Sequence, residues 1–251
     1  RHRLYPELME YEATALVGVP RSGMMVAAQL SMYMHLPLFS FSDGEVVNIG
    51  TGVRSSNLKA LGRRPVLVDD TSCSGKTMQH SDFPRKVVAL ATTHATKYVD
   101  FHGAILESPH ILEWNVFNTT WANQLGLDMD GVVCKDCPGN LGDDNPKYIK
   151  FLNEVEPLNV PRLRSVKAII SARQEKYREQ TVSWLRKYRA KYETLVLWPG
   201  DHRDRSPSAV SQWKAEWADK LGCHLYLESS KGITNLMDQH TVICTPVFVS
   251  K

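Results

Sequence analysis

Short apolar runs alternate with amphipathic segments through the first 106 residues. Such runs, bounded by Gly, Pro or polar residues, are typical of buried strands. Apolar residues at helical spacing predict helices within residues 1–15 and over 24–34. Because strands and helices alternate, we expect a single parallel α/β sheet here. The predicted strands cover residues 15–19, 36–39, 65–68, 86–92 and 101–106.

A second set of strands is predicted in the second half of the chain. Thr181, Trp184 and Leu185 share one face of an amphipathic helix between two of these strands. A chain of 251 residues exceeds the usual size of one domain. We therefore predict two α/β domains, residues 1–122 and 123–251. The strands predicted for the second domain cover residues 125–133, 166–173, 223–230 and 241–244.

Composition places the chain among soluble globular proteins, with 43% apolar and 23% charged residues. The net charge of +3 suits small anionic substrates, and without a dense Lys/Arg stripe it gives no case for nucleic acid. No apolar run approaches the ~20 residues that cross a bilayer, and no secretory leader is visible, so no membrane is expected. Five scattered cysteines indicate a reducing cytoplasm. The chain opens on Arg1 rather than Met, so we expect further residues upstream.

The most informative motif lies in residues 65–78. An apolar run ends in Asp69 and Asp70, and a loop of small hydroxylated residues with Gly75 follows. Ligands of α/β sheets bind at the carboxyl ends of strands, where helix N-termini also offer unpaired N–H groups to phosphate. A P-loop is excluded because it requires glycine five positions before Gly75, where Asp70 stands. The motif predicts a sugar-phosphate site; the alternative is an acidic pair that caps a helix.

This order of residues resembles the phosphoribosyl-pyrophosphate (PRPP) motif of type I phosphoribosyltransferases. The resemblance implies that Asp69 and Asp70 bind the ribose hydroxyls. It further implies a loop that wraps the 5-phosphate through backbone N–H groups and hydroxyls. That loop consists of Thr71, Ser72, Cys73, Ser74, Gly75, Lys76 and Thr77.

The loop after the first predicted strand has a matching role in that family. There the corresponding loop binds pyrophosphate, which implies Arg21, Ser22 and Gly23 as ligands. The same residue types also make an ordinary turn between a strand and a helix. The glycine-rich connection 40–64 stands where the family has a lid that shields the transition state from water, with Arg54 and Lys59 as candidate pyrophosphate ligands. A surface loop is the alternative.

In the second half, Asp128-Met129-Asp130-Gly131 ends a predicted strand. Two carboxylates two positions apart on extended backbone point the same way, and such a pair suits Mg²⁺. The pattern resembles the first motif of the haloacid dehalogenase (HAD) phosphohydrolases. The resemblance implies that Asp128 attacks phosphorus to form an aspartyl-phosphate, while Asp130 protonates the leaving group and then activates water.

Three later residues match the other HAD motifs in order. Ser171 ends a strand with the hydroxyl of the second motif. Lys214 is the first choice for the charge-offsetting lysine of the third motif, and Lys220 the second. Glu228 takes the place of the metal-binding acid, usually aspartate, so that Asp128, Asp130 and Glu228 are the implied Mg²⁺ ligands. The segment is too short for a large cap, which implies a HAD-like Rossmannoid domain with a minimal cap.

Two features near these motifs have more than one interpretation. Cys134 and Cys137 form a Cys-x-x-Cys that could be a zinc or redox pair, or part of a flap over the site. Arg173 and Arg178 are either phosphate ligands or solvent-facing arginines on a helix.

These motifs together predict a bifunctional, cytoplasmic enzyme of nucleotide metabolism. It would transfer phosphoribosyl from PRPP to a base-like acceptor with Mg²⁺, and hydrolyse a phosphate ester of a nucleotide or related small molecule. The alternative is a regulatory protein that senses PRPP or nucleotides, in which the transferase fold binds without turnover. The acceptor base, the phosphatase substrate and the oligomeric state, including a homo-oligomer, are left open by the sequence.

Overall fold

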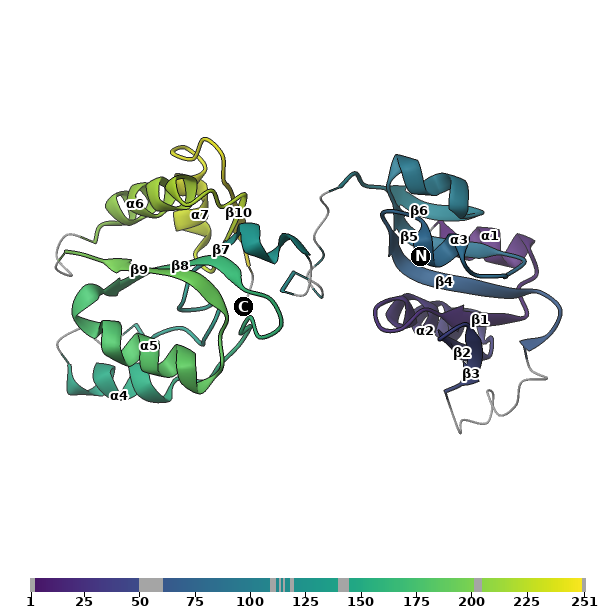
Figure 1. The fold of residues 1–251 in the computed structure, drawn as a ribbon, viewed down its shortest axis with the longest axis horizontal. Helices are drawn as coiled ribbons and strands as arrows, with labels where there is room; N and C mark the ends of the chain where they lie inside the picture. Colours follow the sequence, from purple (N-terminus) through teal and green to yellow (C-terminus); the bar gives the residue numbers. More distant parts are fainter. Residues whose placement is uncertain are drawn as a thin grey trace. The chain divides into compact units, whose positions relative to one another are not determined.

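The computed structural model describes residues 3–49, 61–108, 112, 114, 116–117, 120–139, 145–200 and 205–249. The chain divides into two compact units, Arg1–His110 and Ile111–Lys251, each built around its own sheet (Figure 1). Val116 and Ala122, which precede the predicted domain boundary, pack in the core of the second unit. The domain boundary between residues 122 and 123 stays a prediction. Within the described residues, no helix has both the length and the apolar character to cross a membrane.

The first unit is a mainly parallel sheet in the order β3-β2-β1-β4-β5-β6. All pairs are parallel except β2 with β3. This confirms a parallel-dominated α/β sheet, and five of its strands lie where the apolar runs predicted them. The strands are β1 (Ala15–Gly18), β2 (Leu38–Ser42), β3 (Glu45–Asn48), β4 (Pro65–Ser72), β5 (Lys86–Ala91) and β6 (Phe101–Ile105).

Alternate residues of the central strands build two cores, because successive side chains of a strand point to opposite faces. Leu16 and Val66 lie in the core shared by α1 (Leu4–Glu10) and α2 (Gly23–Met34). Val17 and Leu67 lie in the other core, which Met78 of the one-turn helix α3 (Lys76–Gln79) completes. A 3₁₀ helix, η2 (Thr93–Tyr98), precedes β6.

The connection after β2 differs from the prediction, because it contains the antiparallel strand β3. Asp43 and Gly44 form the turn between β2 and β3, with φ angles of 52° and 86°. An Asp-Gly turn of this kind matches the twist of the two strands and is a strong hairpin signal that the sequence analysis missed. Arg54 and Lys59, the candidate lid residues, lie outside the described residues.

The second unit is a parallel sheet in the order β11-β10-β7-β8-β9. Helices α6 and α7 cover one face of this sheet, and α4 and α5 cover the other (Figure 1). Two 3₁₀ helices complete the described part of the unit. One, η3 (Thr120–Gln124), directly precedes β7, and the other, η4 (Glu175–Tyr177), directly precedes α5. The strands are β7 (Leu125–Leu127), β8 (Val166–Gln174), β9 (Tyr192–Trp198), β10 (Leu225–Glu228) and β11 (Thr245–Phe248), and the helices are α4 (Pro146–Glu154), α5 (Arg178–Lys187), α6 (Pro207–Lys220) and α7 (Lys231–Met237).

One strand of this unit was missed, and two predicted strands were wrong in detail. Strand β9 was not predicted, although its Leu195–Trp198 end is a continuous apolar run. The last strand is β11 rather than residues 241–244. That segment is a turn because the carboxylate of Asp219 accepts hydrogen bonds from the backbone N–H groups of residues 242–244. Finally, the strand predicted over 125–133 ends at Leu127, and a turn follows.

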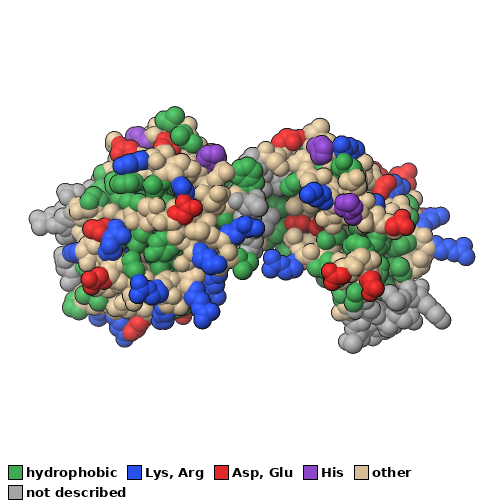
Figure 2. Space-filling model, viewed as in Figure 1, with side chains coloured by type: hydrophobic (Ala, Val, Ile, Leu, Met, Phe, Trp, Pro, Cys, Tyr) green, Lys and Arg blue, Asp and Glu red, His purple; other side chains and the backbone are tan. Residues whose placement is uncertain are grey.

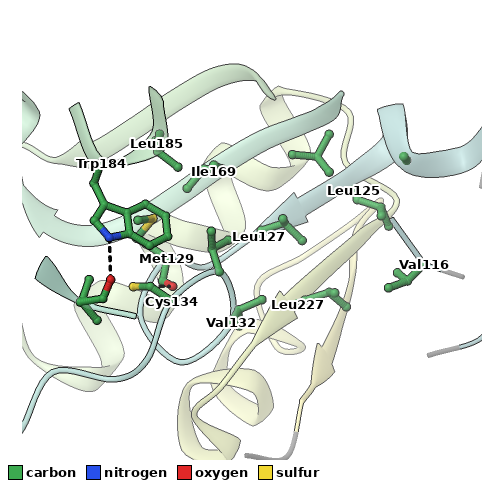
Figure 3. Close-up of a cluster of buried hydrophobic side chains, with 14 residues drawn as sticks. Val116, Leu125, Leu127, Met129, Val132, Cys134, Ile169, Trp184, Leu185 and Leu227 are labelled. Carbon is green, nitrogen blue, oxygen red and sulfur yellow. Dashed lines mark hydrogen bonds between the residues drawn. The ribbon is translucent and has the colours of Figure 1, made fainter. Parts of the chain in front are cut away.

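A buried cluster beneath this turn anchors the Asp-x-Asp motif. Met129, between the two aspartates, is fully buried beside Leu127 and Cys134 (Figure 3). Trp184 of α5 closes the cluster, and its indole Nε1 donates to the Val155 carbonyl at 2.8 Å. Since Met129 points into this core, the flanking carboxylates are free to point elsewhere.

Candidate functional site

The first unit places two predicted ligand loops side by side. In the plane of the sheet, β2 lies on one side of β1, whereas β5 lies on the opposite side of β4. The order of strands therefore reverses between β1 and β4, and the crevice outside such a reversal is where α/β sheets bind ligands. Arg21 follows the carboxyl end of β1, and Asp69 and Asp70 lie near the carboxyl end of β4.

Gly23 brings these two loops into direct contact. A Cβ atom at this position would lie 2.6 Å from Asp69 Oδ1 and 2.9 Å from the Val68 carbonyl oxygen, so a larger residue does not fit. The preceding loop contains a cis peptide bond between Pro20 and Arg21. The residues implied for pyrophosphate and for ribose are thus neighbours in space.

Asp69 and Asp70 are more buried than the sequence suggested. Both lie within β4, which continues to Ser72, and they are only 8% and 3% exposed. Asp69 Oδ1 accepts the backbone N–H of Asp70 at 2.9 Å. Burial first, and then the hydrogen bond and charge of Asp70, raise the pKa of Asp69 to about 8. Asp69 therefore keeps its proton at neutral pH.

This burial predicts a pH-dependent stability for the first unit. Between the usual aspartate pKa of 3.8 and the folded value of about 8, the unfolded chain releases a proton that the folded chain keeps. Stability should therefore fall as pH rises through this window, by up to about 1.4 kcal/mol per pH unit. In Asp69→Asn this pH dependence should vanish. Calorimetry should therefore find that the stability of the variant relative to the wild type increases from pH 5 to pH 8. A constant difference would contradict the assignment.

The predicted phosphate loop lies at the carboxyl end of β4, next to Asp70. Cys73, Ser74, Lys76 and Thr77 are exposed there, whereas Ser72 and Gly75 are buried. The Thr92 hydroxyl donates to the Cys73 carbonyl at 2.8 Å and so holds the loop from β5's end. The helix that follows, α3, is a single turn.

In the second unit, one cavity of about 620 Å³ brings together every residue predicted for catalysis or metal binding. It lies at the carboxyl ends of β7 and β10, where the strand order again reverses. Helix α6 contributes a lysine to it, and α4 contributes an aromatic side chain. The predicted residues in its lining are Asp128, Asp130, Ser171, Lys214 and Glu228.

Lys214 links two buried acids in this cavity. Its Nζ lies 2.9 Å from Asp128 Oδ2 and 2.7 Å from Glu228 Oε2. Burial lowers the pKa of Lys214, but Asp128 and Glu228 outweigh that effect and raise it above its ordinary value. Lys220, the second choice, instead lies over the Trp217 ring at 4.3 Å. The geometry thus favours Lys214 as the charge-offsetting lysine.

One lysine does not balance two acids. Burial, followed by the charge of Glu228, raises the pKa of Asp128 well above its usual range, although Lys214 acts in the opposite direction. Among the described residues, no three His, Cys, Asp or Glu side chains are gathered as a metal site. The carboxylate oxygens that line the cavity nevertheless fit a hard divalent cation. Mg²⁺ at Asp128, Asp130 and Glu228 stays a prediction.

Asp130 is held by a different cation. Arg173 Nε lies 2.9 Å from Asp130 Oδ2, and Arg173 Nη2 lies 2.6 Å from Oδ1. Gly131 follows with φ of +81°, and a Cβ there would meet Ser229 Oγ at 2.4 Å. That hydroxyl donates to the Asp130 carbonyl at 3.0 Å, so glycine at this position lets Ser229 fix the turn. Ser171 is buried, and its Oγ accepts the Arg173 backbone N–H at 3.2 Å.

Several cavity residues were missed or left undecided by the sequence analysis. Arg173 lines the cavity, whereas Arg178 is half-exposed and pairs with Glu175. Tyr148 and Arg205 also line the cavity, and only proximity in the fold could have identified Tyr148. Residues 201–204, just before Arg205, lie outside the described residues.

The Cys-x-x-Cys pair belongs to the surroundings of this cavity. Cys134 is buried, with its Sγ 3.4 Å from Asp130 Oδ1, and Cys137 lines the cavity. Burial raises the pKa of both thiols, which disfavours the thiolate needed for zinc binding or redox chemistry. The position favours the flap interpretation over the zinc or redox one.

Comparisons with known proteins give a partial likeness. No family model and no curated protein sequence matches the chain. Among solved structures, a purine phosphoribosyltransferase from Pyrococcus horikoshii Ot3 has 22% identity and a TM-score of 0.34, over 44% of this chain and 83% of its own. An orotate phosphoribosyltransferase from Aeropyrum pernix has 17% identity and a TM-score of 0.30, over 40% and 64%. Neither likeness assigns a reaction, and the predicted HAD relationship remains a prediction.

Proposed function

We propose that the protein is a bifunctional enzyme with a phosphoribosyltransferase in its first unit and a phosphomonoesterase in its second. The observation that carries the second activity is the Lys214 ammonium between Asp128 and Glu228. A nucleophilic carboxylate, an offsetting cation and a nearby hydroxyl are the parts that phosphoryl transfer through an aspartyl-phosphate requires.

In the first half-reaction, a carboxylate oxygen of Asp128 bonds to phosphorus as the bond from phosphorus to the leaving oxygen breaks. Asp130 gives that oxygen a proton. In the second, Asp130 takes a proton from water, whose oxygen attacks phosphorus and releases inorganic phosphate and the Asp128 carboxylate. Ser171 and Lys214 hold the phosphoryl oxygens. Mg²⁺ at Asp128, Asp130 and Glu228 would supply further charge neutralisation when bound.

For the first unit, we propose that PRPP binds across the ends of β1 and β4. Asp69 and Asp70 hold the ribose hydroxyls, the loop from Thr71 to Thr77 holds the 5-phosphate, and Arg21 meets the pyrophosphate. The bond from C1 to the pyrophosphate oxygen breaks, and a bond from C1 to a nitrogen of the acceptor base forms, while the proton of that nitrogen passes to the departing pyrophosphate. The contact between Gly23 and Asp69 supports this arrangement. A 5-phosphate delivered by this site is a suitable substrate for the second.

The transferase is tested by pyrophosphate release from PRPP and Mg²⁺ with a panel of bases. In Asp70→Asn we expect kcat/KM to fall about 10- to 100-fold, because a charged hydrogen bond to the ribose is lost. The exposed acid in Asp82→Asn serves as the control, with unchanged turnover. PRPP binding without release of pyrophosphate by the wild type would favour the sensor alternative, and full activity in Asp70→Asn would contradict the site.

A further inference from the structure

Arg173 is fully buried, yet its guanidinium is not fully hydrogen-bonded within the part of the chain that the structure describes. Its side chain is 1% exposed, with Nε and Nη2 on Asp130 and Nη2 also 3.3 Å from Cys134 Sγ. The guanidinium lies 5.9 Å from the centre of the Phe151 ring, which supports it on one side. Nη1 has no hydrogen-bond partner among the residues that the structure describes.

A buried donor left unpaired is destabilising, and in native proteins such a group calls for a specific explanation. Arg173 lines the cavity that also holds Asp128 and Lys214. An oxygen of a molecule bound in this cavity would satisfy Nη1. Because guanidinium N–H groups bond most strongly to anionic oxygens, an oxyanion is the preferred acceptor.

The place of Arg173 identifies which part of a substrate this oxyanion would belong to. In the proposed hydrolysis the phosphoryl group lies at Asp128 and Lys214, and the leaving oxygen lies at Asp130. Arg173 pairs with Asp130, the residue proposed for the leaving oxygen, at 2.6 Å. An acceptor for Nη1 therefore belongs to the leaving group and not to the phosphoryl group.

A second arginine lies at the same end of the cavity. Arg205 donates Nη1 to the Ala172 carbonyl at 2.9 Å, one residue from Arg173. Asp136 also lines the cavity. Two arginines thus lie at this end of the cavity. The Nη1 of Arg173, which lacks a partner within the described part of the chain, favours an added acceptor.

We propose that Arg173 and Arg205 form a subsite for an oxyanion on the leaving group. The preferred substrate is then a phosphomonoester that carries a carboxylate or a second phosphate a few bonds from the scissile phosphate. This assignment rests on the proposed phosphomonoesterase activity and names the substrate class of that same site.

The test compares three esters that share one carbon skeleton. Glycerol 3-phosphate has a neutral leaving group, 3-phosphoglycerate adds a carboxylate, and glycerol 1,3-bisphosphate adds a phosphate. With the wild-type chain and Mg²⁺, kcat/KM for at least one anionic ester should exceed that for glycerol 3-phosphate by about 10-fold or more, as one charge-assisted hydrogen bond provides. Preference for only one of the two would support the subsite and identify its ligand.

Two variants show whether Arg173 produces this preference. Arg173→Lys keeps a positive charge beside Asp130 but lacks the second edge of the guanidinium, so the preference should fall to about 3-fold or less. Arg178→Gln removes a half-exposed arginine that pairs with Glu175 outside the cavity lining, and the preference should persist. Circular dichroism checks that each variant is folded. The comparison of the three esters with the wild-type chain tests the subsite even if neither variant folds.

The outcomes separate the subsite from the proposed function. If the wild type hydrolyses p-nitrophenyl phosphate and all three esters without preference, the subsite is overturned and the phosphomonoesterase stands. If it hydrolyses none of them, the phosphomonoesterase fails and the subsite with it. A preference that persists unchanged in Arg173→Lys also overturns the role of Arg173.

Discussion

Asp128→Asn should abolish hydrolysis of phosphate esters, with kcat lower by at least about 1,000-fold. An amide cannot attack phosphorus, so the aspartyl-phosphate cannot form. The variant should still fold, because Lys214 keeps its 2.7 Å ion pair with Glu228. The measurement is release of inorganic phosphate from p-nitrophenyl phosphate with Mg²⁺.

A matched control for this variant is Glu154→Gln. Glu154 is an exposed acid on α4 that pairs only loosely with Lys150, at 3.9 Å. Its replacement should leave phosphate release unchanged. Full Mg²⁺-dependent activity in Asp128→Asn would mean that another residue is the nucleophile.

Lys214→Met should produce the largest loss of stability. It leaves the buried carboxylates of Asp128 and Glu228 facing each other without a cation. Breaking a buried ion pair by removing one partner destabilises proteins by about 3–5 kcal/mol. For a unit of this size, that corresponds to a fall in melting temperature of about 6–20 °C. Differential scanning calorimetry should find the change in the transition of the second unit.

Two further variants check the cause of this loss. Lys220→Met, on the same helix, removes a lysine that lies over the Trp217 ring, and it should change stability little. Adding Glu228→Gln to Lys214→Met should restore part of the stability, because one of the two facing charges is gone. A loss below about 1 kcal/mol in Lys214→Met would show that the acids are protonated or hydrated instead.

Much of the fold could be predicted because its signals are local. The apolar run before Asp69 and the run before Asp128 each predicted a central strand, and both strands are there. The missed strand β3 had an Asp43-Gly44 turn signal, but its apolar run of Val46 and Val47 is too short to resemble a buried strand. Residues 241–244 were misassigned because the N–H groups that a strand would use are bound by Asp219, a residue distant in sequence.

The candidate sites were predictable only in part, for the same reason. Order along the chain was enough to select Asp128, Ser171 and Glu228, and the structure places all three in one cavity. It ranked Lys214 before Lys220, but the two lysines lie on the same helix and only the structure shows that they differ in what they face. That choice depends on distances between separate elements.

Local pattern alone was enough to show that this chain forms two α/β units with acids near the ends of their central strands, because strand formation depends on neighbouring residues. The tertiary structure decided the rest. It buried Asp69 and Asp70 within β4, joined Lys214 to two acids, and set Arg173 against Asp130 from 43 residues away. Charge pairing and burial are properties of positions in space, and only the packing of distant segments brings those side chains within a few ångströms of one another.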